Sequence, residues 1–232
     1  MSWVVTAAIL ALVAGIVATL VVAVKRGNGA ATVNAVASLA AVLVAVAVTG
    51  GLVPAPAWLA ATGPAVTLWV AAAGLLHCVG MLGPYDTVWW WDHLTHVVSG
   101  AFVAALAYAA LLVVGRGGPG AALDWATVAA LTVLLTLLAG VFWELIELVA
   151  RSLGERFGVE PVLVHYGWRD TALDLGFDLL GAILVVLLDV RVFVAVADRS
   201  GGATQAMLLG GSGVLVLGSV TMAVFLRLNG SR

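Results

Sequence analysis

The chain consists of long apolar stretches separated by short connections that are charged or rich in glycine and proline. A helix that crosses the hydrocarbon core of a bilayer needs about 20 predominantly apolar residues. Seven stretches meet this requirement, and each predicts one membrane-spanning helix. They cover residues 2–24, 31–53, 65–82, 92–114, 125–150, 171–197 and 203–226. The pattern therefore predicts an all-α, polytopic transmembrane helical bundle with about seven spans.

The basic residues predict an orientation for this bundle, because lysine and arginine favour the cytoplasmic side of a membrane. If the N-terminus lies outside, most basic residues fall on the cytoplasmic side: Lys25, Arg26, Arg151, Arg156, Arg169, Arg227 and Arg232. The three others then lie outside or near the outer boundary: Arg116, Arg191 and Arg199. We therefore predict a multi-pass protein of the cell membrane with a cytoplasmic C-terminus.

The composition agrees with a membrane location. Apolar residues make up 63% of the chain and charged residues 9%, whereas ordinary globular domains have about 45–50% and ~25%. The formal net charge is -2 and the chain has no basic run, so we expect the lipid bilayer and no nucleic acid as a partner. With one cysteine, Cys78, the chain forms no intramolecular disulfide. No repeat or soluble segment is evident, and we expect one integral membrane domain over residues 1–232.

Ionisable residues inside membrane spans are costly and point to function. Here they are concentrated in three motifs at the predicted cytoplasmic ends of the spans. The first motif opens the fourth span, where the spacing of Asp92 and His96 places them on one helix face. His93 lies three residues before His96 and could join them. The second motif contains Glu144 and Glu147, near the end of the fifth span.

The third motif contains three aspartates at the start of the sixth span. Asp170, Asp174 and Asp178 recur every four residues, so they lie within about 80° of one face. Asp92, Glu144 and Glu147 join these three aspartates in one group of carboxylates. The obvious counter-ions of this group are Arg151 and Arg169. Such a group cannot remain fully ionised at low dielectric. Either several carboxylates are protonated, or a bound cation neutralises them.

If a bound cation neutralises these carboxylates, the group is a metal centre. Carboxylate oxygens with one imidazole suit Mg²⁺, Mn²⁺ or Ca²⁺, and Zn²⁺ also fits. The candidate metal ligands are His96, Glu144, Glu147, Asp170 and Asp174. The candidate catalytic residues are Asp92, His93 and Asp178, with Asp92 or His93 as a general base or as the partner that orients a ligand.

Several of these residues also have a purely structural interpretation. Asp92 and Asp170 each open a helix, where an acid satisfies free N–H groups and complements the helix dipole. The glutamates lie near a predicted helix C-terminus, where the dipole disfavours anions, although a pair between Glu147 and Arg151 would explain one of them. His77, in the third span, is more typical of a hydrogen-bonded packing residue than of a ligand.

The order of the three motifs resembles the uncharacterised YjdF-like membrane proteins. The resemblance covers about residues 84–190, which we take as the motif-bearing core. The matching residues are Asp92, His96, Gly100, Glu144, Glu147, Asp170, Thr171, Asp174, Asp178 and Gly181. A weaker likeness reaches the VanZ-like family, whose last motif has asparagine at the position of Asp178. The resemblance implies that these residues form one site, and the VanZ-like likeness implies cell-envelope or lipid-linked chemistry.

Three functions fit this pattern. The first is a metal-dependent enzyme that acts on a lipid or lipid-linked small molecule at the inner leaflet. The second is a proton- or cation-coupled transporter that uses the same carboxylates, although the outer halves of the spans are almost free of polar residues. The third is a non-catalytic membrane scaffold whose acids fix helix packing. The metal-dependent enzyme is the interpretation we favour.

Overall fold

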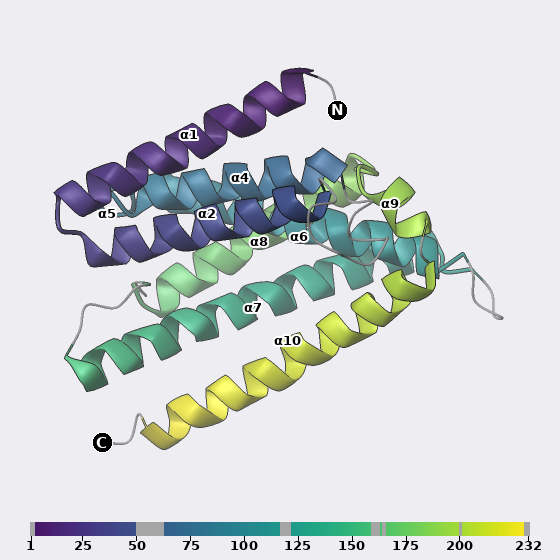
Figure 1. The fold of residues 1–232 in the computed structure, drawn as a ribbon. Coiled ribbons are helices and arrows are strands. Elements are labelled where there is room, and N and C mark those ends of the chain that lie inside the picture. The colour runs from purple at the N-terminus through teal and green to yellow at the C-terminus, as the bar shows by residue number, and fades with distance from the viewer. Residues whose placement is uncertain are drawn as a thin grey trace. The chain divides into compact units, whose positions relative to one another are not determined.

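A computed structural model describes residues 3–49, 63–116, 122–158, 163, 166–199 and 201–229. Every regular element in these residues is a helix, which confirms the all-α prediction for them. By its contacts the chain divides into two compact units, Met1–Thr95 and His96–Arg232 (Figure 1). Residues 50–53 of the second predicted span and part of the connection between the fifth and sixth spans lie outside the described residues.

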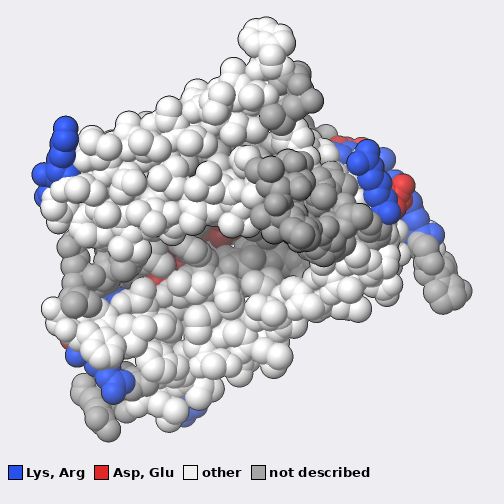
Figure 2. All heavy atoms as spheres, viewed as in Figure 1, with Lys and Arg blue, Asp and Glu red and all other residues white. Residues whose placement is uncertain are grey.

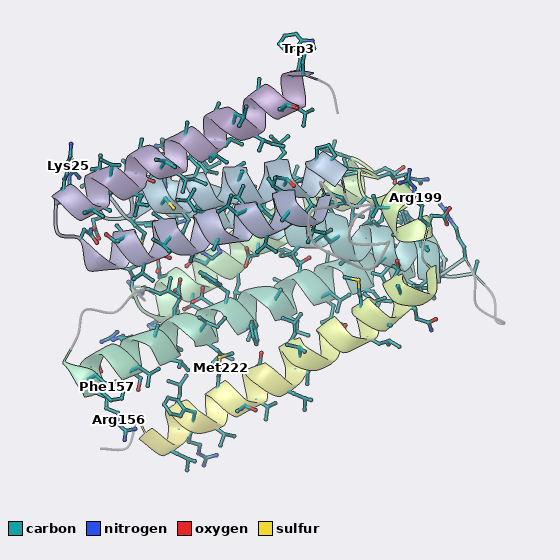
Figure 3. The ribbon with its side chains drawn as sticks, in the orientation of Figure 1. Trp3, Lys25, Arg156, Phe157, Arg199 and Met222 are labelled. Carbon is teal, nitrogen blue, oxygen red and sulfur yellow. The ribbon has the colours of Figure 1, made fainter. Side chains whose placement is uncertain are left out.

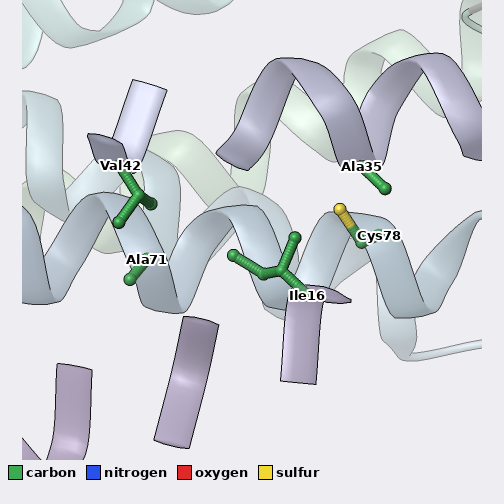
Figure 4. Close-up of a cluster of buried hydrophobic side chains, with 5 residues drawn as sticks. All are labelled: Ile16, Ala35, Val42, Ala71 and Cys78. Atoms are coloured by element: carbon green, nitrogen blue, oxygen red, sulfur yellow. The ribbon is translucent and has the colours of Figure 1, made fainter. Parts of the chain in front are cut away.

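Three long helices make up most of the first unit. They are α1 (Trp3–Lys25), α2 (Gly29–Thr49) and α4 (Gly63–Gly80), followed by the short α5 (Pro84–Thr87). Each of α1, α2 and α4 packs against the other two. A core of buried side chains joins them (Figure 4): Ile16, Ala35, Val42, Ala71 and Cys78. Its small residues let the helix backbones approach closely, as is typical of membrane helices.

The second unit contains the rest of the helices. They are α6 (Trp91–Val114), which begins in the first unit, α7 (Trp125–Phe157), α8 (Trp168–Leu187), α9 (Val194–Asp198) and α10 (Gly201–Asn229). Helix α7 packs against both α8 and α10. Helices α6 and α8 meet at Gly181, where an added Cβ would lie 2.6 Å from the Val97 carbonyl oxygen. This close approach fixes the two helices that carry the aspartate and histidine motifs.

Six helices in the described residues are long and apolar enough to cross a membrane: α1, α2, α4, α6, α7 and α10. The remaining long helix, α8, has 20 residues, but its first half carries Arg169 and three aspartates. In Figure 2 the Lys and Arg side chains gather toward the edges of the face shown, and most of the atoms between them belong to uncharged residues. Figure 3 labels Lys25 at the end of α1 and Arg156 at the end of α7. These features agree with the predicted polytopic bundle.

Helix α7 extends beyond residue 150, the predicted end of the fifth span. Helix α7 continues to Phe157, and in this extension Arg151 and Glu155 form an exposed ion pair one turn apart, with 2.9 Å between Nε and Oε1. It ends at Gly158, whose φ of 64° is the left-handed conformation that favours glycine at a helix end. At 33 residues, the helix is about 50 Å long, more than the ~30 Å hydrocarbon core. Its last turns therefore extend beyond the membrane-spanning part.

The predicted end of the sixth span, residue 197, is wrong. Helix α8 ends at Leu187, and Asp189 adopts a left-handed φ of 49°. The Asp189 carboxylate holds this turn, because Oδ1 accepts hydrogen bonds from Arg191 Nε at 2.8 Å and from the Tyr108 hydroxyl at 2.7 Å. The apolar residues that follow form the separate helix α9. An ion pair and a polar turn thus interrupt what the apolar pattern predicts as one helix.

Candidate metal centre

His96 of α6 lies between two aspartates of α8. Its Nδ1 is 3.3 Å from Asp178 Oδ1, and its Nε2 is 3.8 Å from Asp174 Oδ1. The side chains are nearly enclosed, with exposed fractions of 12% for His96, 3% for Asp174 and 7% for Asp178. The structure therefore brings together one predicted catalytic residue, Asp178, and two predicted metal ligands.

Glycines make room for the Asp178 carboxylate. A Cβ on Gly100 of α6 would lie 2.8 Å from Asp178 Cα, and a Cβ on Gly140 of α7 would overlap Asp178 Oδ2. Together with Gly181, these glycines allow α6, α7 and α8 to close around one acid. Gly100 and Gly181 belong to the sequence motifs, whereas Gly140 was not predicted. Its signal in the sequence is its position four residues before Glu144, on the same face of α7.

Glu144 connects α7 to α8. The Thr171 hydroxyl donates a hydrogen bond of 2.6 Å to Glu144 Oε2, and the Glu144 residue is 4% exposed. Thr171 lies three residues before Asp174, so Glu144 contacts α8 one turn from the pair that His96 bridges. The prediction that the glutamates lie near a helix C-terminus is wrong, because α7 continues to Phe157. Glu144 is thus too far from the helix end for the dipole to affect its charge, and its burial is what makes an ionised carboxylate costly there.

Glu147 and Asp170 have local explanations. The Trp143 indole Nε1 donates to Glu147 Oε1 at 2.9 Å, one turn away on α7. Arg151, the predicted partner of Glu147, forms an ion pair with Glu155. Asp170 lies in the first turn of α8, where it complements the helix dipole. The geometry thus gives Glu147 and Asp170 less support as ligands than Asp174 has.

Asp92 and His93 lie in the first turns of α6. The Thr95 hydroxyl donates to the Asp92 backbone carbonyl at 2.7 Å and approaches Asp92 Oδ1 at 3.4 Å. Asp92 precedes His96 by four residues in one continuous helix, so the two share a helix face as predicted. The His93 ring stacks edge to face on Trp89, with 6.2 Å between centroids.

The distances around His96 suit a metal ligand and its supporting partner. The 3.3 Å contact between Nδ1 and Asp178 is a hydrogen bond, which would leave Nε2 as the coordinating nitrogen. The 3.8 Å from Nε2 to Asp174 Oδ1 is too long for a hydrogen bond. It suits two ligands that each lie about 2.0–2.2 Å from a shared ion. His96 and Asp174 both belong to a group of residues that each offer one potential ligand atom, and these atoms lie within 4.8 Å of one another.

Two other polar features lie outside this cluster. Thr132 and Thr136 of α7 are 0% and 1% exposed, and each hydroxyl donates to the backbone carbonyl four residues earlier. Both threonines lie on the same face of α7 as Gly140 and Glu144, one and two turns before Gly140. In the first unit, His77 is hydrogen-bonded to the Tyr85 hydroxyl at 2.6 Å and to Asn34 Oδ1 at 3.1 Å, which agrees with a packing residue.

Comparison with models of known protein families identifies the family of the chain. Residues 6–195 match the family described as "Predicted membrane protein (DUF2238)". The chain belongs to this family. The match includes the first two helices, beyond the residues 84–190 that carry the YjdF-like resemblance. No curated protein and no solved structure matches the chain.

Membership of DUF2238 agrees with the long apolar helices, and the protein is an integral membrane protein. Every candidate site residue lies within the matched region, from Asp92 to Asp178. The family description names no reaction, so any function rests on the geometry of these side chains.

Proposed function

We propose that this protein binds a divalent metal ion between His96 and Asp174 and uses it in a reaction on a lipid or lipid-linked substrate. The arrangement of His96 between two nearly enclosed aspartates carries the proposal. Asp178 accepts a hydrogen bond from Nδ1–H and keeps the ring in the orientation that presents Nε2 to Asp174 and the ion. Carboxylates that hold a ligating histidine in this way are common around metal ions.

Further ligands come from the same part of the chain. Asp92 stands one turn before His96 in α6 and offers a third ligand. Glu144, which accepts a hydrogen bond from Thr171 of α8, offers a fourth. Glu147 and Asp170 remain predicted ligands, although each also has a structural explanation: the hydrogen bond from Trp143 for Glu147 and the helix dipole for Asp170. Carboxylates with one imidazole accept Mg²⁺, Mn²⁺, Ca²⁺ or Zn²⁺.

A metal ion in this position would polarise a phosphoryl or carbonyl oxygen or activate water. His93 lies three residues from His96 and is the candidate general base. His96 and Asp174 lie in the second turns of α6 and α8, so the proposed site is near the start of both helices. The weaker likeness to the VanZ-like family also favours lipid-linked chemistry, by analogy. The predicted orientation places this chemistry at the cytoplasmic leaflet of the cell membrane.

Thermal unfolding with added metal tests the proposal. A ligand that binds only the folded protein stabilises it by about 2.7 kcal/mol at 100 times its Kd. We expect Mn²⁺ or Zn²⁺ to raise the melting temperature of the detergent-purified protein, and Asp174→Asn to lose this response. Glu155→Gln neutralises an exposed carboxylate in α7 and should keep it. A full response in Asp174→Asn would show that the ion binds elsewhere.

One observation favours a carrier as the second candidate. Thr132 and Thr136 continue the buried face of α7 away from Glu144, so this helix is not wholly apolar beyond the acidic cluster. A proton- or cation-coupled transporter would produce flux in proteoliposomes that disappears in Asp178→Asn. The metal-dependent enzyme predicts no flux under any ion gradient.

A further inference from the structure

An apolar groove with a volume of about 450 Å³ lies between α7 and α8. Its lining is entirely aliphatic and includes Ala130, Val133 and Leu137 of α7 and Ile183, Val186 and Leu187 of α8. Pockets that hold small ligands have volumes of about 300–1,000 Å³. The groove therefore has the size of a ligand site, but no polar group in it could orient a polar ligand.

The groove and the acidic cluster occupy successive parts of one seam between α7 and α8. Along this seam Glu144 contacts Thr171, then Gly140 approaches Asp178, and the groove begins at Leu137. Ala130, Leu137 and Glu144 recur every seven residues, so they lie on the same side of α7. The distance from Ala130 to Leu137 is about 10 Å along the helix, and Glu144 is about 10 Å further. The seam thus has a polar end and an apolar end.

We propose that this groove holds the hydrocarbon chain of the lipid whose polar head lies at the candidate metal centre. The inference rests on the proposed function and adds how the substrate is held. An aliphatic lining selects an apolar occupant, and the apolar chains available in a bilayer are those of lipids. Leu134 and Leu187 line the groove and are 60% and 68% exposed, which leaves it open for entry from the side.

Photo-crosslinking tests the inference. The probe is phosphatidic acid with a diazirine near the end of one acyl chain, added to phosphatidylcholine vesicles that contain the protein. We expect cross-links in the groove segments of α7 and α8 to exceed those on the exposed face of α10 several-fold. Unlabelled phosphatidic acid should compete for them. Ala130→Phe, which fills the groove, should reduce them several-fold, whereas Ala206→Phe on the exposed face of α10 should not.

Metal content, measured on the same samples, separates this inference from the proposed function. Ala130→Phe should keep its metal, and Ile183→Phe serves if Ala130→Phe does not fold. Uniform cross-linking without competition, in a protein that holds metal, would overturn the groove alone. Competed cross-linking in the groove of a protein that holds no metal would overturn the metal centre and show a lipid site that serves another purpose.

Discussion

At the scale of single residues, the two aspartates of α8 have different functions in our account. Asp174 faces the proposed ion, whereas Asp178 positions His96 through Nδ1. A coordinating residue and a positioning residue respond differently to substitution. Removal of the positioning carboxylate should weaken metal binding by about 10–100-fold without abolishing it.

This difference predicts the behaviour of Asp178→Asn. The variant should fold and should need about 10–100 times more metal for the same stabilisation, since the amide orients the imidazole less well. The measurement is the midpoint of a metal titration followed by melting temperature, with the exposed Asp198→Asn as the matched control. A scaffold that uses Asp178 only for packing predicts a lower melting temperature and no change in that midpoint.

Asp189 is a second residue with a measurable contribution. Hydrogen bonds from Arg191 and then from the Tyr108 hydroxyl lower the pKa of the Asp189 carboxyl. A lowered pKa in the folded state stabilises the fold above the unfolded value of about 3.9. This stabilisation is lost as the pH falls through the folded pKa.

We therefore expect Asp189→Asn to be less stable than the wild type at neutral pH, and the difference to shrink below about pH 4. Asparagine also tolerates the left-handed backbone, so the variant removes the charge without adding strain. Melting temperatures of both proteins across pH 3–7 give the result. A difference that stays constant over this range would assign the effect to something other than the carboxylate charge.

At the scale of helices, the close approach of α6 to α8 should be the most sensitive feature. A Cβ on Gly100 would lie 2.8 Å from a backbone atom of Asp178, which cannot move aside as a flexible side chain can. We expect Gly100→Ala to destabilise the fold by about 1–3 kcal/mol. Gly176 of α8 has open space around it, so Gly176→Ala should be neutral or stabilising by up to about 1 kcal/mol. Equal effects in denaturant unfolding would contradict this packing.

The sequence predicts the helices well because the apolar stretches are long and the breakers between them are strong. It predicts the ends of α7 and α8 poorly. Helix α7 continues through the charged residues Arg151 and Glu155, and α8 ends at a turn that contains Asp189, and the apolar pattern shows neither. The pattern reports where a helix is apolar, whereas the backbone turns at Gly158 and Asp189 lie where α7 and α8 stop.

The candidate site was predicted in part for similar reasons. The four-residue spacing of the aspartates correctly places Asp174 and Asp178 on one face toward His96. The different environments of Glu144 and Glu147 could not be predicted, because they depend on Thr171 and Trp143. Gly140 was missed because a glycine in an apolar helix gives no chemical signal until its neighbours are known.

At the scale of the whole molecule, the orientation in the membrane decides which leaflet the site serves. The arginine distribution predicts that the turn after α1 is cytoplasmic and that the connection after α6 is outside. Single cysteines at Arg26 and Arg116, in a Cys78→Ser background, test this prediction. A membrane-impermeant maleimide added to intact cells should label Arg116→Cys and spare Arg26→Cys. The reverse labelling would place the site at the outer leaflet.

The central claim is that a divalent metal ion binds beside His96. The most direct measurement is elemental analysis by mass spectrometry of the detergent-purified protein, after loading with metal and dialysis against metal-free buffer. Our account predicts close to one divalent ion per chain in the wild type and little or none in His96→Ala. No retained metal after loading with Mg²⁺, Mn²⁺, Ca²⁺ or Zn²⁺ would contradict it, and the carboxylates would then be protonated or paired.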